Sequence, residues 1–169
     1  MRGLKKPKNN IIMAKINLDA IDRKILRFLV KNARMPFLEI ARECGISGAA
    51  IHQRIKKLED SGIVLGSHLS VNPKMLGFDV CAFVYIRIKD PMTTVAVVEK
   101  IKHIHEVVEC HFITGNYTMM VKLYCVNNEH LMHVITDGIR RIPGVSSTET
   151  YISLDESFQR EPYIDYLDK

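Results

Sequence analysis

The sequence predicts an α+β protein with two domains, and three observations support this. Apolar residues recur at helical spacing in three segments before residue 60, whereas strand-like and helical segments alternate after residue 79. Charge divides at the same place: 14 Lys and Arg stand against 6 Asp and Glu up to Gly66, but 10 stand against 13 from Ser67 onward. A solvated basic face would give the same balance as a polyanion-binding module, so charge alone leaves both interpretations open.

The first helix is expected to begin near Leu18 or Asp19 and to end around Asn32–Ala33. Asp19 is a suitable N-cap residue, because its carboxylate can accept a hydrogen bond from a free amide of the first turn. Pro36 then opens the next helix. The apolar face of the first helix comprises Ile21, Ile25, Leu26, Phe28 and Leu29.

A second and a third helix are predicted between Phe37 and Gly62, joined by a tight turn. Gly45 allows the left-handed backbone that ends a helix, and Ser47 can cap the next one. The second helix has an apolar face of Leu38, Ala41 and Cys44, with Ile40 alongside, and the third has a stripe of Ile51, Ile55 and Leu58.

The stripe on the third helix leaves a polar and cationic face that suits the major groove of DNA. Small residues at its N-terminal end would permit close approach. A helical hairpin without a DNA role is the alternative, and Arg54 could instead brace the domain by pairing with Glu59 or Asp22. The candidate DNA-binding residues are Ser47, Gly48, Ala49, His52, Gln53, Arg54, Lys56 and Lys57.

Residues 62–66 and 68–71 are expected to form a short β wing, and Asn72-Pro73 and Gly77 to punctuate a linker. The domains predicted are a basic flexible tail (1–14), a winged helix-turn-helix domain (15–66), a linker (67–78), a second domain (79–155) and a C-terminal tail (156–169).

The second domain is predicted to follow the order βαββαβ, the split βαβ or ferredoxin-like arrangement. Its strands are expected at 80–89, 107–114, 117–125 and 145–154, with a turn at Gly115-Asn116. Pro91 opens a helix that runs towards His105, and Pro143-Gly144 ends a helix over 128–142.

Several classes of protein are excluded by what the sequence lacks. No apolar run approaches the ~20 residues of a membrane helix. Four scattered cysteines without a CxxC pair indicate a reducing, cytoplasmic setting. Without a Gly-rich phosphate loop, nucleophile elbow or paired acid-base motif, no catalytic residues are assigned. The pair His130 and His133 lacks a cysteine at ligand spacing, so no metal site is predicted.

The combination resembles the Lrp/AsnC (feast/famine) family of transcriptional regulators over residues 17–156, and within it the AsnC-type branch. The matching motifs include Leu18-Asp19-x-x-Asp22-x-x-Ile25-Leu26, Gly45-Ile46-Ser47, Arg54-x-x-x-Leu58-Glu59-x-x-Gly62, Leu76-Gly77-Phe78-Asp79-Val80, Thr114-Gly115-Asn116-Tyr117-Thr118 and Pro143-Gly144-Val145.

The resemblance implies a RAM/ACT-like second domain, a dimer built through its sheets, further assembly towards an octamer, and an amino-acid effector bound between subunits near Gly115. A plain β-hairpin is the alternative interpretation of the Gly-Asn turn. Leucine-responsive members carry an acidic residue and an aromatic where this chain has Thr118 and Met119, so asparagine or another small polar amino acid fits better. The candidate effector-binding residues are Thr114, Gly115, Asn116, Tyr117 and Thr118, with Thr148 and Thr150 as weaker candidates.

The expected function is therefore sequence-specific binding of double-stranded DNA, controlled by a small amino acid. His52, Gln53 and Lys56 are expected to read base edges. Arg54, Lys57 and the tail residues Lys5, Lys6 and Lys8 are expected to contact phosphates. The alternative is an architectural DNA-binding protein of the same fold that needs no effector.

Overall fold

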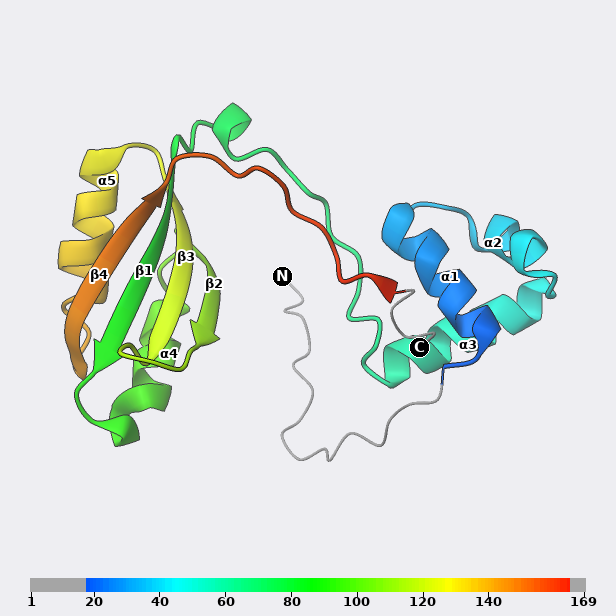
Figure 1. Ribbon diagram of the computed structural model, residues 1–169, viewed down its shortest axis with the longest axis horizontal. Helices are drawn as coiled ribbons and strands as arrows, with labels where there is room; N and C mark the ends of the chain where they lie inside the picture. The colour runs from blue at the N-terminus through cyan, green and yellow to red at the C-terminus, as the bar shows by residue number, and fades with distance from the viewer. Residues whose placement is uncertain (1–17, 165–169) are drawn as a thin grey trace. The chain divides into compact units, whose positions relative to one another are not determined.

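The computed structural model describes residues 18–164, so the predicted basic tail lies outside the described residues. The chain divides into two compact units (Figure 1). One comprises Met1–Leu69 together with Gln159–Lys169, and the other comprises Ser70–Phe158. None of the described helices is long and apolar enough to cross a membrane.

The N-terminal unit contains three helices, α1 (Ala20–Lys31), α2 (Phe37–Cys44) and α3 (Gly48–Asp60). Their ends follow the predicted capping chemistry. The Asp19 carboxylate accepts a hydrogen bond from the Asp22 amide at 2.8 Å, and the Asp22 carboxylate accepts one from the Asp19 amide at 3.4 Å. Gly45 adopts φ 64° after α2, and the Ser47 hydroxyl accepts a hydrogen bond from the Ala50 amide.

The core of this unit forms where the three helices meet. It is made of the buried residues Ile25, Leu26, Ile40, Ala41, Ile51, Ile55 and Leu58. The predicted place of Leu38 in the apolar face of α2 is wrong, because its side chain is 59% exposed and Ile40 fills the core instead. Ile164, in the segment predicted as a C-terminal tail, also packs against this core.

The predicted β wing is not formed, since residues 61–72 contain no strand. Gly62 and Gly66 adopt φ values of 74° and 139°, which interrupt the extended backbone that strand pairing requires. A two-stranded ribbon is also marginal without further strands or a helix to pack against. The expected helix-turn-helix is thus present, but the segment after it is irregular as far as a short 3₁₀ turn, η1 (Lys74–Leu76).

The second unit is a four-stranded antiparallel sheet of β1 (Val80–Ile88), β2 (Val107–Phe112), β3 (Met119–Cys125) and β4 (Val145–Ser153). The strand order β2-β3-β1-β4 is that of the predicted βαββαβ arrangement. The helical segments are η2 (Pro91–Thr93), α4 (Thr94–Ile101), α5 (Asn128–His133) and the π-helical η3 (Val134–Ile139).

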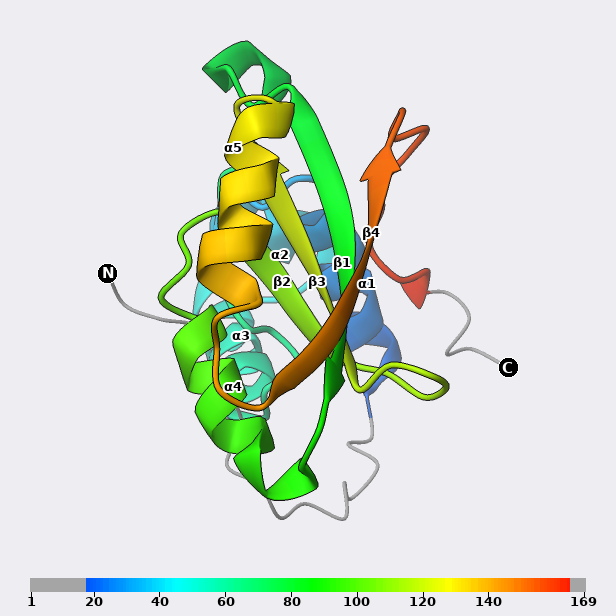
Figure 2. The ribbon, with the colours of Figure 1, turned by 90° about the vertical axis from the view of Figure 1, so that its left-hand side faces the viewer.

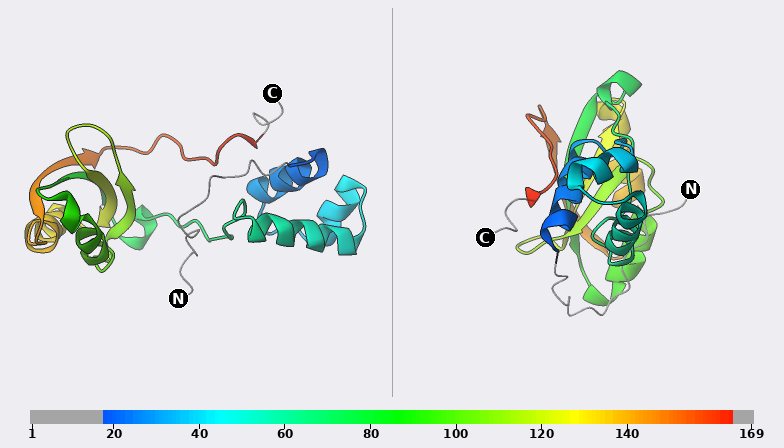
Figure 3. Two further views of the ribbon diagram at one scale, coloured as in Figure 1. Left: turned by 90° about the horizontal axis from the view of Figure 1, so that it is seen from below. Right: turned by 90° about the vertical axis from the view of Figure 1, so that its right-hand side faces the viewer.

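Helices α4 and α5 cover the same face of the sheet (Figures 2 and 3). Alternate residues of β1 point into this covered face, from Val80 to Ile88, and pack with buried residues of β3 and both helices. We call the other side of the sheet the open face. It carries Phe83, Tyr85 and Arg87 of β1, and their cross-strand neighbours on β3 and β4.

Two boundaries in this unit differ from the sequence prediction. The turn expected at Gly115-Asn116 is a longer loop, residues 113–118, because β2 ends at Phe112 and β3 begins at Met119. The single helix expected over 128–142 changes to π geometry at Val134, and the amide of Arg140 bonds the carbonyl of Ile135, five residues back.

Candidate functional site

Helix α3 exposes one polar face opposite its apolar stripe. Ala49, His52, Gln53 and Lys56 follow the spacing i, i+3, i+4 and i+7, and all four are exposed. The His52 ring lies edge-on to Phe37 of α2, with ring centroids 5.4 Å apart. This face therefore combines a small residue, two hydrogen-bonding side chains and a cation, which matches the chemistry of base edges and phosphates.

The first turn of α3 lies close to α2. A Cβ atom added to Gly48 would come within 2.9 Å of Cδ2 of Leu38. The Leu38 side chain therefore lies against Gly48, and because glycine has no side chain, α2 and α3 can approach closely there. Ser47 and Ala49 flank this position and are both exposed.

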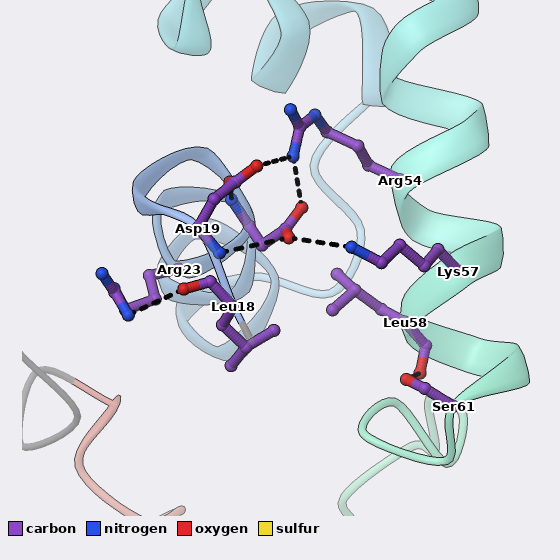
Figure 4. A network of polar contacts seen from close by, with 8 residues as sticks. Leu18, Asp19, Arg23, Arg54, Lys57, Leu58 and Ser61 are labelled. Atoms are coloured by element: carbon purple, nitrogen blue, oxygen red, sulfur yellow. Dashed lines mark hydrogen bonds and ion pairs between the residues drawn. The ribbon is translucent and has the colours of Figure 1, made fainter. Parts of the chain in front are cut away.

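Arg54 differs from the other candidates because its guanidinium is held within the domain (Figure 4). Its Nη1 atom lies 2.6 Å from the carboxylate of Asp19 and 2.6 Å from that of Asp22, and Asp22 is fully buried. The sequence left open that Arg54 braces the domain by pairing with Glu59 or Asp22. The structure shows the pairing with Asp22, and Asp19 is a second partner that the sequence did not indicate. Hydrogen bonds to Asp19 and Asp22 raise the pKa of Arg54 further above its ordinary range.

The loop 113–118 presents the second group of candidates. Thr114, Gly115 and Asn116 are exposed, and Gly115 has φ 111°. The Ile113 amide donates a hydrogen bond to the Thr118 carbonyl, and the Thr118 amide donates one to the Ile86 carbonyl. Among the described residues, no other amide of the loop donates to a backbone carbonyl. The four consecutive amides of residues 114–117 thus have no backbone carbonyl partner within residues 18–164, and such a run of amides can receive a carboxylate.

Tyr117 ties this loop to the open face of the sheet. Its hydroxyl donates a hydrogen bond to the carboxylate of Glu149, which also accepts one from Tyr151. The guanidinium of Arg87 lies 5.3 Å from the centre of the Tyr117 ring. The bond from Tyr117 lowers the pKa of Glu149 and raises that of Tyr117.

The sequence prediction did not include this group of Tyr85, Arg87, Glu149 and Tyr151. The alternation of Phe83, Tyr85 and Arg87 along β1 was the available signal, since residues two apart share a face. The pairing of Tyr85 with Glu149 across β1 and β4, however, depends on strand register.

The two effector candidates on β4 face the helix-covered side of the sheet. Thr148 is paired with Ile86 and Thr150 with Val84, so both threonines point to the helix-covered face, away from Glu149. The Thr118 hydroxyl accepts a hydrogen bond from the Ile88 amide at 3.2 Å. Thr148 and Thr150 therefore lie on the opposite face of the sheet from Glu149, the hydrogen-bond partner of Tyr117.

The histidines on α5 contact different carboxylates. Nε2 of His130 lies 3.1 Å from Glu106, whereas Nδ1 of His133 lies 3.1 Å from Asp137. Within residues 18–164 there is no cluster of three or more His, Cys, Asp or Glu able to hold a metal ion.

Comparison with known proteins identifies the two units. The model of the AsnC-type helix-turn-helix domain matches residues 18–59, and that of the Lrp/AsnC ligand binding domain matches residues 81–163. Regulatory protein AsnC of Haemophilus influenzae is 37% identical over 145 residues, which cover 86% of this chain and 97% of that protein. The chain belongs to the Lrp/AsnC family.

Solved structures of family members agree in fold. The structure of Escherichia coli AsnC has a TM-score of 0.80 and 35% identity, and covers 86% of this chain and 98% of its own. The feast or famine regulatory protein of M. tuberculosis, complexed with L-methionine, has a TM-score of 0.81 and 28% identity over 88% of this chain and 99% of its own.

The prediction of a DNA-binding transcriptional regulator with an amino-acid-binding domain is thereby confirmed, and so is the exclusion of an enzyme. Helix α3 belongs to the helix-turn-helix domain, and the loop 113–118 belongs to the ligand-binding domain. Each half of the regulator thus carries one group of the candidate residues.

Proposed function

We propose that this regulator binds a small polar amino acid, with asparagine as the first candidate, at the loop 113–118. The observation that carries the proposal is the run of amides at Thr114–Tyr117, around Gly115, that have no backbone carbonyl partner among the described residues. These amides suit the effector's carboxylate, and the exposed Thr114 and Asn116 side chains suit an amide group. Thr148 and Thr150 are left out, because they point to the covered face.

The open face of the sheet supports a homodimer that brings the effector between subunits. Phe83, Tyr85 and Tyr151 lie on it, no helix of residues 70–158 covers it, and Tyr151 is 54% exposed. Aromatic side chains that are half apolar and half polar are typical of interfaces between proteins. Tyr117 joins the effector loop to this face, so an effector there would act on the packing of two sheets and on assembly towards an octamer.

DNA recognition is proposed for the exposed face of α3. His52, Gln53 and Lys56 would read base edges, Lys57 would contact phosphate, and Ser47 to Ala49 would lie closest to the duplex. A dimer presents two such helices, so a pseudo-palindromic operator is expected. If Gln53 reads a base, Gln53→Ala relaxes preference at one position and costs about 1–3 kcal/mol, whereas uniform weakening would make it a phosphate contact.

Sedimentation velocity tests the effector proposal. The full chain is compared with and without a panel of amino acids at millimolar concentration. A change in assembly size with asparagine, lost in Thr114→Val and kept in the control Thr136→Val, is the expected result. An assembly indifferent to every amino acid would overturn the effector site and favour the architectural role, and a monomer throughout would overturn the proposed interface.

A further inference from the structure

Arg54 lies in the middle of the recognition helix, directly after Gln53 and three residues before Lys57. Its side chain nevertheless points to the start of α1, where one nitrogen donates to both Asp19 and Asp22 (Figure 4). Lys57 also reaches the same buried carboxylate, with Nζ 3.7 Å from Asp22. Arg54 and Lys57, on successive turns of α3, thus both contact one buried carboxylate, that of Asp22, in the first turn of α1.

The two cations of this group, Arg54 and Lys57, differ in how accessible they are to a DNA phosphate. Asp19 and Asp22 balance Arg54 and Lys57, so the four side chains carry no net charge. The Arg54 side chain is 27% exposed and hydrogen-bonded to two carboxylates at 2.6 Å. The Lys57 side chain is 58% exposed and pairs with Asp22 at the longer distance. Of the two cations, Lys57 is the one positioned to exchange its carboxylate for a phosphate.

We propose that Arg54 is a positioning residue for sequence recognition and does not itself contact DNA. Anchored by Asp22, it sets the rotation of α3 about its axis and therefore the direction in which Gln53 and Lys56 point. Lys57, held loosely by the same carboxylate, is directed towards the phosphates. This inference rests on the proposed role of α3 in reading DNA.

The physical reason is that a planar guanidinium fixes the directions of its donors, whereas an ammonium does not. The two N–H bonds of Nη1 lie in the guanidinium plane and reach Asp19 and Asp22, whereas the ammonium of Lys rotates freely about its stem. Removing the cationic partner of a buried carboxylate also raises the free energy of the folded state, because the remaining charge is neither paired nor solvated. Loss of Arg54 or of Asp22 should therefore alter the same property, the orientation of α3, although the two changes have opposite effects on net charge.

The test compares Arg54→Lys and Asp22→Asn in full-length protein, using a DNA site selected from a random pool and an unrelated random-sequence duplex. Binding is measured by fluorescence anisotropy over a series of salt concentrations. Both variants are expected to lose roughly tenfold in preference for the selected site over the random duplex. For Arg54→Lys, which keeps the net charge, binding to the random duplex and the slope of log affinity against log salt should stay unchanged. Asp22→Asn also releases Lys57, so its binding to the random duplex should strengthen while the preference falls.

A phosphate contact would behave differently. Arg54→Lys would then retain most of the affinity, and Asp22→Asn, by releasing Arg54, would strengthen binding to both duplexes equally and leave the preference for the selected site unchanged. Either result would overturn the proposal. Lys57→Gln serves as the matched control, with uniform weakening and a salt slope reduced by about 1. If Gln53→Ala leaves sequence preference intact, the reading role of α3 fails, which is separate from the role of Arg54.

Folding of each variant is checked by thermal melting. If Asp22→Asn does not fold, Asp19→Asn takes its place, because Asp19 is 51% exposed at its side chain and Asn caps a helix as well as Asp does. This variant removes one of the two acceptors of Arg54. A loss of preference for the selected site with an unchanged salt slope supports the proposal, and no change in preference contradicts it.

Discussion

Within residues 18–164, each of the two units buries one charged side chain, and the two units stabilise it in opposite ways. Asp22 is fully buried in the N-terminal unit, and Lys122 is 7% exposed in the C-terminal unit. Asp22 is surrounded by Arg54 and Lys57, both on the recognition helix. Lys122 lies on the open face of the sheet between Glu109 and Glu156, at 3.7 and 3.2 Å.

The difference lies in which partner is buried. In the N-terminal unit the carboxylate of Asp22 is buried and its cations are partly solvated. Loss of Arg54 would therefore leave a buried carboxylate without its nearest cation. In the C-terminal unit the carboxylates around Lys122 are 41% and 49% exposed, so losing Lys122 leaves acids that water can solvate. The first arrangement holds a helix in place, whereas the second holds the chain segment after β4 against the sheet.

The largest expected effect breaks the first arrangement. Arg54→Met should lower the free energy of unfolding of the N-terminal unit by about 3–5 kcal/mol, because buried Asp22 keeps the Asp19 amide and, as its one cation within the described residues, the more distant Lys57. Urea unfolding followed by circular dichroism measures this change. A loss below about 1 kcal/mol would place the pair among weak surface ion pairs.

The corresponding change in the other unit should be much smaller. Lys122→Met preserves the apolar stem, and we expect a change within about 1 kcal/mol in the free energy of unfolding of the sheet. Hydrogen exchange should still report faster exchange around Glu156, which loses its ion pair. A loss equal to that of Arg54→Met would remove the contrast between the two units.

The pH dependence of stability should differ in direction between the units. A backbone hydrogen bond from Asp22 and the side chain of Arg54 lower the pKa of Asp19 below its ordinary 3.8. The stabilisation is therefore present above 3.8 and is lost as pH falls through the folded pKa. Acid titration of unfolding should show a shallower loss in Asp19→Asn than in the unaltered chain, and equal slopes would contradict the assignment.

Lys122 should act at the alkaline end. Burial lowers its pKa, but hydrogen bonds with Tyr124 and Glu156 outweigh this effect and raise it above 10.5. Its stabilisation is complete below pH 10.5 and is lost as pH rises through the folded pKa. Unfolding of the sheet above pH 10.5 should therefore be less pH-dependent in Lys122→Met, and an unchanged dependence would count against the ion pair.

The smallest effect concerns the cysteines of the C-terminal unit. Burial raises the pKa of the Cys125 thiol to about 11, and Cys125 is fully buried. Cys110 on the edge strand β2 is exposed. Alkylation at pH 8 followed by mass spectrometry should modify Cys110 first and Cys125 last. Early modification of Cys125 would show that the sheet opens locally.

Features that depend on local chemistry were predictable from the sequence. The Asp19 cap, the left-handed Gly45 and the alternation along β1 follow from single residues and short periods. The prediction of a β wing was wrong. Gly62 and Gly66 have positive φ values, which interrupt the extended backbone that two paired strands would need. The carboxylate pair around Arg54 and the placement of Glu149 beside Tyr117 join residues 32 or more apart, and only the folded packing and strand register determine them.

The most direct test of the account is the affinity for a selected DNA site with and without millimolar asparagine, measured by fluorescence anisotropy on the full chain. Coupling between a ligand loop and a recognition helix predicts a change in Kd of roughly fivefold or more. Linkage requires the same factor in the affinity for asparagine when DNA is added. Identical Kd values with and without asparagine, and with every other amino acid of the panel, would contradict control by an effector.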